Sequence, residues 1–257
     1  MMEKKKKYKT GLVLSGGGTR GFGHLGVIKA LEEEGIQPDI VSGVSAGAIV
    51  GALYADGNSP DEILETLSSK RIFDYLDFNI PRTGLVRMNG FEKTLKKYLK
   101  AKIFEDLKIP LLVFAVNMNT AQYVCFEKGN LALAVKASSS VPIVFPPIEV
   151  NGDLYCDGGV INNFPVEPLR KVCDKVIGVN VNPLVRRKTG FHNLKQIAER
   201  TFQLSVRSHV LNRKELCDLF IEPVEADNFG LLDLSSGKAI FKVGYEYTKK
   251  LLENNEL

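Results

Sequence analysis

The sequence predicts an α/β protein built on a central, mainly parallel β-sheet, and the order of its apolar segments is the main reason. Short apolar runs of strand length alternate with longer segments whose apolar residues recur every three or four positions, as on helices. Parallel strands are buried on both faces and are joined by helices, which produces this alternation. Hydrophobic residues make up 44% of the chain and charged residues 25%, which excludes the disordered and coiled-coil classes.

The individual elements follow from the same pattern, in chain order. An apolar run predicts a strand at Tyr8–Leu14, and a helical period predicts a helix over Gly23–Gly35 that ends at a glycine. Further strands are expected at Ile40–Gly43, Leu111–Asn117, Val124–Phe126, Val176–Val181 and Leu219–Glu222. Helices are expected between most of these strands, so the sheet is predicted to be mainly parallel.

The length of 257 residues fits one large domain, which we expect over residues 9–257. Residues 1–8 carry a run of lysines and are predicted to form a basic, solvated tail. At about 59–104 the periodic pattern becomes irregular and includes a loop at Asn79–Gly84, so we expect a partly helical insertion over the sheet.

Composition and spacing also limit the cellular setting and the cofactors. No apolar stretch approaches the ~20 residues that cross a bilayer, and Leu12–Leu14 is too short for the apolar part of a signal peptide. We therefore expect a cytoplasmic protein. A metal and a cofactor are not expected. The cysteines have neither CxxC nor metal-ligand spacing, which predicts reduced, structural thiols at Cys125, Cys156, Cys173 and Cys217.

Ser45 lies in the segment Gly43–Gly47, directly after a predicted strand and before a small-residue segment that reads as a helix. This pattern is typical of a nucleophile elbow, in which a serine occupies a sharp turn between strand and helix. Small residues are needed two positions to either side of the serine, because larger side chains would collide with neighbouring backbone. The positive end of the following helix would face the reacting atoms. Ser45 is therefore a candidate nucleophile.

The glycine-rich loop Ser15–Gly21 follows the first predicted strand and precedes the first helix. Backbone amides in such a loop face outward and bind negative charge. If Ser45 attacks an ester, these amides could stabilise the oxyanion that forms on the carbonyl oxygen.

A nucleotide-binding alternative uses the same loop. Two sets of glycines fit the GxGxxG dinucleotide fingerprint, namely Gly16, Gly18 and Gly21, and Gly21, Gly23 and Gly26. That fold needs an acidic residue at the end of the second strand, whereas Asp39 precedes this strand. Arg20 also stands where a phosphate-binding P-loop would need lysine. Nucleotide binding is therefore the weaker interpretation.

A serine nucleophile needs a base, and none of the histidines has a convincing setting. His24 is expected to lie in the core or to support the glycine loop. His192 or His209 could complete a triad of the α/β-hydrolase order after Asp157. Asp157 itself lies in the turn-rich stretch Asn151–Gly159 and could accept the serine proton directly. A turn aspartate that binds its own backbone explains the same stretch.

Three motifs in the chain occur in one characteristic order: Gly16–Gly21, Gly43–Gly47 and Asp157–Gly159. Together with Ala137–Pro147 and Val160–Pro165, they resemble the patatin-like phospholipase family, and the resemblance runs from about Lys9 to Val181. The resemblance implies a three-layer α/β/α fold and a serine–aspartate dyad that hydrolyses acyl esters of lipids without histidine or metal. Lipid esters or phospholipids are then the expected substrates, and nucleic acid is not an expected partner.

The same resemblance implies a role for each motif residue. Ser45 is the nucleophile, Asp157 is the general base, and Arg20 organises an oxyanion hole. The oxyanion donors implied are the amides of Gly16, Gly17 and Gly18. The residues that support the motifs are Gly21, Gly43, Gly47, Gly158 and Gly159. Nothing in these motifs selects water as the acyl acceptor, so an acyltransferase or thioesterase on the same scaffold stays open.

A basic amphipathic helix is predicted at Phe91–Ile103. Its apolar residues share one face: Phe91, Leu95, Tyr98, Leu99 and Ile103. This face fits peripheral contact with an anionic membrane, and it equally fits packing against the sheet. The segment Lys238–Leu252 has a similar pattern, for which core packing is the default interpretation.

Overall fold

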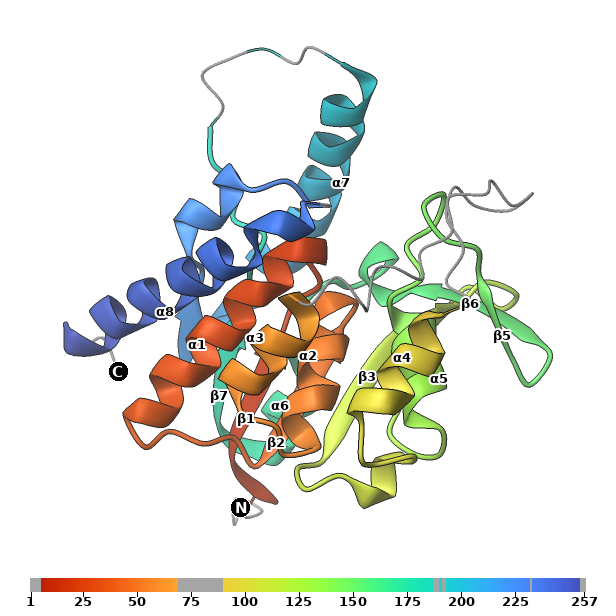
Figure 1. Ribbon diagram of the computed structural model, residues 1–257, viewed down its shortest axis with the longest axis horizontal. Coiled ribbons are helices and arrows are strands. Elements are labelled where there is room, and N and C mark those ends of the chain that lie inside the picture. The colour runs from red at the N-terminus through yellow and green to blue at the C-terminus, as the bar shows by residue number, and fades with distance from the viewer. Residues whose placement is uncertain (1–5, 69–89, 187–189, 191–192, 232, 255–257) are drawn as a thin grey trace, which may run out of the picture.

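The computed structural model describes residues 6–68, 90–186, 190, 193–231 and 233–254. Over these ranges a central mixed sheet lies between two helical layers, as expected (Figure 1). The strands of this sheet are β1 (Tyr8–Leu14), β2 (Ile40–Val44), β3 (Leu111–Asn117), β4 (Gln122–Phe126), β5 (Ile148–Val150), β6 (Asp153–Asp157), β7 (Cys173–Val179) and β8 (Leu219–Ile221). Their order is β5-β6-β3-β2-β1-β7-β8, and β4 pairs with β3.

The described α-helices are α1 (Phe22–Glu33), α2 (Ala46–Ala55), α3 (Pro60–Ser68), α4 (Phe91–Tyr98), α5 (Leu131–Ser138), α6 (Glu167–Val172), α7 (Leu194–Leu211) and α8 (Gly237–Glu253). Short 3-10 turns lie at Gly18–Gly21, Phe104–Asp106, Gly158–Val160, Lys214–Leu216, Val224–Asn228 and Leu234–Ser236. The expected strands are all present, with ends shifted by a few residues. The expected helix at Gly23–Gly35 begins one residue earlier and stops at Glu33.

The sheet is parallel through β3, β2, β1, β7 and β8, and it is antiparallel where β4, β5 and β6 join it. The hairpin of β5 and β6 was not predicted, although its turn residues Asn151 and Gly152 form an Asn-Gly pair. Both have positive φ, 53° and 88°, as a two-residue hairpin turn requires. The sequence pattern marked this segment only as turn-rich, because each strand is too short to show a period.

Two apolar clusters cover the faces of the sheet and give the three layers. The larger cluster joins the sheet to α1, α2, α5 and α8, with buried residues such as Leu12, Leu25 and Leu53. The smaller cluster lies on the other face, where Phe164 and Leu169 pack against strand residues that include Val13. Apolar side chains thus cover both faces of the strands that carry the predicted motifs.

The first and last helices of the described chain, α1 and α8, lie side by side (Figure 1). Their backbones touch at glycines: a Cβ on Gly26 would overlap the carbonyl oxygen of Phe241, and one on Gly244 would overlap that of Gly23. A Cβ on Gly21 would meet the Cβ of Ala46 in α2 at 2.7 Å. The second GxGxxG match, Gly21, Gly23 and Gly26, therefore consists of helix-packing glycines.

The predicted amphipathic helix at Phe91–Ile103 is shorter than expected. Helix α4 ends at Tyr98, because Leu99 adopts an extended backbone with ψ of 129°. Phe91, Leu95 and Leu99 are buried in the larger apolar cluster, whereas Ile103 lies off the helix and is exposed. The apolar stripe thus packs in the core, as the second interpretation of this helix predicted. The similar stripe of α8 also packs in the core.

The remaining expectations concern the cysteines, the N-terminal tail, the loop at Asn79–Gly84 and membrane-spanning segments. All four cysteines are free thiols, as expected. The loop expected at Asn79–Gly84 and residues 1–5 of the tail lie outside the described residues. Among the described helices, none is long and apolar enough to cross a membrane.

Gly47 shows why the turn after β2 tolerates only small residues. A Cβ at this position would overlap the carbonyl oxygens of Leu14 and Ser15 at the end of β1. These are backbone atoms of a central strand and cannot give way. We expect Gly47→Ala to destabilise the protein by about 3 kcal/mol or more, as measured by urea unfolding. Gly190→Ala, at an exposed glycine with open space around it, should change stability by less than about 0.5 kcal/mol.

Candidate active site

The strand register brings Ser45 and Asp157 together. Strand β2 pairs with β3 as far as Val44, which lies opposite Phe114. From the next residue of β3, Ala115, the neighbour on that edge is β6, which ends at Asp157. Strand β4 occupies the other edge of β3, so β2 and β6 meet end to end along a single edge. Ser45 follows Val44 at this junction, and Asp157 therefore lies next to it although 112 positions separate them in the chain.

Ser45 forms the sharp turn that the sequence predicted. Its φ of 54° and ψ of −123° are unusual for a residue with a side chain, and such strain is a feature of functional turns. Helix α2 begins at Ala46, so its positive end lies beside the serine. Ser45 is nearly buried, with 8% of its surface exposed. Ser45 thus lies at a strained turn, close to the amino end of α2 and largely shielded from solvent.

Asp157 is 3% exposed and its two carboxylate oxygens have different surroundings. Oδ1 accepts a hydrogen bond from the Gly159 amide at 2.7 Å, as a turn aspartate would. Oδ2 has no hydrogen-bond partner within the described residues. Burial raises the pKa of Asp157 from 3.8 to about 6, although the Ser45 hydroxyl and the Gly159 amide favour its charged form. The residue is therefore both a turn aspartate and a neighbour of Ser45.

The glycine-rich loop passes directly over Ser45. An added Cβ on Gly16 would lie 3.0 Å from the Cβ of Ser45. The Gly16 amide donates a long hydrogen bond of 3.4 Å to the Asn163 carbonyl oxygen. Gly18 has a φ of 54° and no space for a side chain under the carbonyl oxygen of Leu231. The Leu231 backbone thus fills the space in which a side chain at position 18 would lie.

Two buried asparagines set the direction of one peptide group in this loop. The Nδ2 atoms of Asn163 and Asn182 both donate to the Gly16 carbonyl oxygen. In a planar trans peptide the N–H points opposite to the C=O, so the Gly17 amide points away from both asparagines. Within the described residues the Gly17 and Gly18 amides donate to no protein acceptor. They are free to bind an anion.

Arg20 connects the loop to the C-terminal part of the chain. Its side chain is 1% exposed, and Nε donates to the Phe229 carbonyl oxygen at 2.9 Å. Nη2 lies 3.4 Å from both the carbonyl oxygen and Oδ1 of Asp227. Arg20 therefore supports the loop from behind, by fixing the 3-10 turn that follows the glycines.

The histidines take structural positions where they are described. His24 is fully buried, its Nε2 lies 2.8 Å from the Ser15 carbonyl oxygen, and burial lowers its pKa to about 4. It thus supports the glycine loop as a neutral side chain. Nδ1 of His209 accepts from the Asn163 amide at 3.4 Å, and His209 makes no hydrogen bond to Ser45 or Asp157 in the described structure. His192 lies outside the described residues.

Asn163 and Asn182 were not predicted as site residues. Asn163 is 2% exposed and also lies close to Gly159, so it joins the glycine loop to the aspartate turn. Asn182 follows the carboxyl end of β7, where polar residues commonly face a ligand site in parallel sheets. The position of Asn182 after a parallel strand could therefore have indicated a site residue. For Asn163, the sequence offered only its place in the family-like segment Val160–Pro165.

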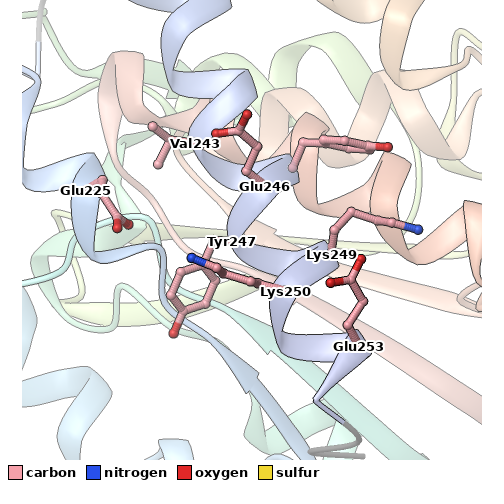
Figure 2. A pocket seen from close by; sticks show the side chains of 8 residues that line it. Glu225, Val243, Glu246, Tyr247, Lys249, Lys250 and Glu253 are labelled. Atoms are coloured by element: carbon pink, nitrogen blue, oxygen red, sulfur yellow. The ribbon is translucent and has the colours of Figure 1, made fainter.

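A separate surface hollow of about 400 Å³ lies along α8 (Figure 2). Its lining includes Lys249, Lys250 and Glu253, and it contains none of the predicted site residues. Lys249 pairs with Glu34 of the α1 end, so this charge is part of the α1–α8 contact. The candidate active site is thus the junction of β2 and β6 rather than this hollow.

The buried carboxylate of Asp157 makes a testable contribution to stability. Its pKa of about 6 in the folded protein exceeds the ordinary 3.8, so the folded state holds the proton more tightly than the unfolded chain. The stability that this tighter proton binding gives the folded state is fully present below about pH 4, and it is lost as the pH rises through 6. Asp157→Asn should therefore raise the free energy of unfolding by about 3 kcal/mol at pH 8 and leave it unchanged at pH 4.

Urea unfolding of both proteins at the two pH values measures this difference. Asp106→Asn, at an exposed carboxylate, is the matched control and should show no such change with pH. Equal stability of Asp157→Asn and the parent protein at pH 8 would mean that the ionised carboxylate is well compensated in the folded state.

Comparisons with known proteins place this chain in a family. The family model described as Patatin-like phospholipase matches residues 12–170. An uncharacterised NTE family protein of Mycobacterium tuberculosis is 34% identical over 178 residues, covering 68% of this chain and 49% of that protein. Patatin-like phospholipase domain-containing protein 6 of Homo sapiens is 30% identical over 275 residues, covering 93% of this chain and 20% of that protein.

The fold has a solved counterpart in VipD from Legionella pneumophila, with a TM-score of 0.53 and 18% identity. The match covers 96% of this chain and 67% of that chain. The chain spans half or less of the length of the two relatives named above. The family model includes the glycine loop, the Ser45 turn and the Asp157 turn, so the predicted resemblance is confirmed: this chain belongs to the patatin-like phospholipase family.

Proposed function

We propose that this protein hydrolyses acyl esters of lipids, with Ser45 as the nucleophile and Asp157 as the general base. The single observation that carries the proposal is the end-to-end meeting of β2 and β6 along β3, which sets a serine in a strained turn against a buried carboxylate. The free Gly17 and Gly18 amides next to this pair supply the remaining requirement of acyl transfer.

The first half-reaction forms an acyl-enzyme. Ser45 Oγ attacks the ester carbonyl carbon while its proton moves to Asp157, for which Oδ2 is the unpartnered oxygen within the described residues. Collapse of the tetrahedral intermediate breaks the ester bond, and the protonated carboxyl returns the proton to the leaving alcohol. In the second half-reaction the carboxylate takes a proton from water, hydroxide attacks the acyl group, and Ser45 recovers its proton as the acid leaves. A pKa of about 6 suits both directions of this transfer near neutral pH.

The negative charge of each intermediate falls on the former carbonyl oxygen. Amides of Gly17 and Gly18 serve as its principal donors, because the Gly16 amide already donates to Asn163. The positive end of α2 adds to the same field. Arg20 holds the donors in place through the Phe229 and Asp227 contacts rather than by touching the oxyanion.

The substrate class rests on the family. The family model and the human relative both carry phospholipase in their names, so a phospholipid or another lipid ester is the proposed substrate. Among the described residues, the site offers no group that would select water over an alcohol or thiol as acyl acceptor. Product analysis with a supplied acceptor separates hydrolysis from acyl transfer.

Loss of either member of the dyad should abolish activity while the fold remains intact. We expect Ser45→Ala and Asp157→Asn to lower kcat for a short-chain nitrophenyl ester by about 10³-fold or more. A fluorophosphonate should label the parent protein at Ser45 and leave Ser45→Ala unlabelled. Retention of activity in folded Asp157→Asn would contradict the role of this carboxylate.

The pH dependence of kcat/KM tests the role of Asp157 without any substitution. Since the base must be ionised, kcat/KM of the parent protein should rise up to tenfold per pH unit below pH 6 and level off above about pH 7. Release of nitrophenol is followed at its isosbestic wavelength. A flat profile between pH 5 and 8 would assign the proton transfer to another group.

We also propose that the protein contacts a lipid surface through the carboxyl end of its sheet. Exposed aliphatic side chains lie in three segments: Ile143 in the loop before β5, Val160 and Ile161 after the aspartate turn, and Leu194 and Ile197 on α7. Ile143 is 79% exposed and Leu194 is 80% exposed. Helix α7 projects beyond the sheet on the side opposite the described N-terminal end (Figure 1). Apolar side chains around the opening of a site suit a substrate held in a membrane.

Replacing two of these side chains should weaken membrane binding without changing the chemistry. The double variant Ile143→Ser, Leu194→Ser should bind phospholipid vesicles about tenfold more weakly, because less apolar surface enters the bilayer. Its kcat/KM for a soluble nitrophenyl ester should stay within about twofold. Ile103→Ser, at an exposed isoleucine near the amino end of β3, is the matched control. Co-sedimentation with zwitterionic and with anionic vesicles measures binding, and equal binding by all variants would place the contact elsewhere.

A further inference from the structure

The hydroxyl of Ser138, the last residue of α5, lies between β3 and the end of β2. Ser138 is fully buried, with no exposed surface. Its Oγ accepts a hydrogen bond from the Ser45 amide at 2.9 Å and donates one to the Phe114 carbonyl oxygen at 2.6 Å. The mechanism above assigns no role to this residue.

The ladder of hydrogen bonds between β2 and β3 explains why these two partners matter. Val41, which lies opposite Leu111, donates from its amide to the carbonyl oxygen of Pro110. In a parallel ladder the donors of one strand recur at every second residue. The next donors of β2 toward β3 are therefore those of Gly43 and then Ser45, and the regular acceptor for Ser45 is the Phe114 carbonyl oxygen.

Ser138 thus occupies the place of one missing hydrogen bond between the strands. The Ser45 amide and the Phe114 carbonyl would bond directly if β2 continued as a regular strand. The hydroxyl instead bridges them, so both groups stay paired while the backbone turns away at Ser45. An unpaired buried amide or carbonyl is strongly unfavourable, and this bridge removes that obstacle to the left-handed turn.

The same serine run also holds the partner of Ser45. Ser140, two residues after Ser138, accepts a hydrogen bond from the Asp157 amide at its carbonyl oxygen, at 2.9 Å. Ser139 Oγ donates to the Val135 carbonyl oxygen at 2.8 Å and lies 3.4 Å from the Ser45 carbonyl oxygen. The end of α5 therefore fixes the backbone on both sides of the junction between β2 and β6.

We infer that Ser138 is a positioning residue, which sets the nucleophile turn by replacing the last hydrogen bond between β2 and β3. This inference rests on the proposed role of Ser45 as the nucleophile. Ser138 touches no reacting atom and acts through the Ser45 amide. Its effect should appear in the rate of the chemical step rather than in substrate binding.

Ser138→Ala tests the inference by removing the bridging oxygen. We expect kcat for the soluble ester to fall by about 10- to 100-fold with KM within about threefold, because the hydroxyl of Ser45 loses its alignment. Ser42→Ala is the matched control, since Ser42 is a fully buried serine of β2 whose hydroxyl donates to the Pro165 carbonyl oxygen at 2.7 Å. Its kcat should stay within about threefold of the parent value.

Hydrogen exchange of the Ser45 amide, observed by NMR, tests the bridge without any need for activity. Exchange should become at least about tenfold faster in Ser138→Ala and remain unchanged in Ser42→Ala. If Ser138→Ala does not fold, Ser138→Thr and Ser138→Val are compared with each other instead. Threonine and valine have similar shapes, and threonine has a hydroxyl group where valine has a methyl group.

The outcomes separate the inference from the proposed function. Unchanged kcat and exchange in Ser138→Ala, or an equal loss of kcat in Ser42→Ala, would overturn the positioning role even if Ser45→Ala is inactive. A parent protein without Ser45-dependent hydrolysis would overturn the proposed function, and the exchange measurement would still decide whether Ser138 holds the Ser45 turn.

Discussion

The pairing along one edge of β3 is the constraint on which the site depends. Two strands that run in opposite directions share this edge. β2 pairs with the first part of it and ends at Val44, and β6 pairs with the rest and ends at Asp157. Because the partners change between Phe114 and Ala115, the ends of two distant segments are brought to one point. Neither of the two proposed catalytic residues needs a long loop to reach the other, so the geometry is set by sheet hydrogen bonds, among the most rigid contacts in a protein.

Local patterns in the sequence predicted the parts of the site that depend on near neighbours. The turn at Ser45 is encoded by Gly43 and Gly47, and the glycine loop by a strand followed by a helix, so both could be recognised from the order of residues alone. Asp157 was identified through its Gly-Gly neighbours, although its buried setting and its contact with Ser45 depend on strands that the pattern missed. The β5–β6 hairpin was missed because its strands are only three and five residues long.

Contacts between distant segments account for what the sequence could not show. Asn163, Asn182 and Ser138 are ordinary polar residues in the chain, and each gains its role from backbone groups far away in sequence. The stripe on α4 illustrates the opposite difficulty, since a core-facing helix and a membrane-facing helix carry the same period. Only the position of Phe91 and Leu95 in the apolar cluster separates the two.

The close contact between α1 and α8 has a consequence for how the protein is made. Gly23 and Gly26 near the start of the chain meet Phe241 and Gly244 near its end, and Arg20 meets Phe229. During synthesis on the ribosome the glycine loop and Ser45 emerge well before α8. We therefore expect the geometry of the proposed site to be complete only after α8 has docked on α1.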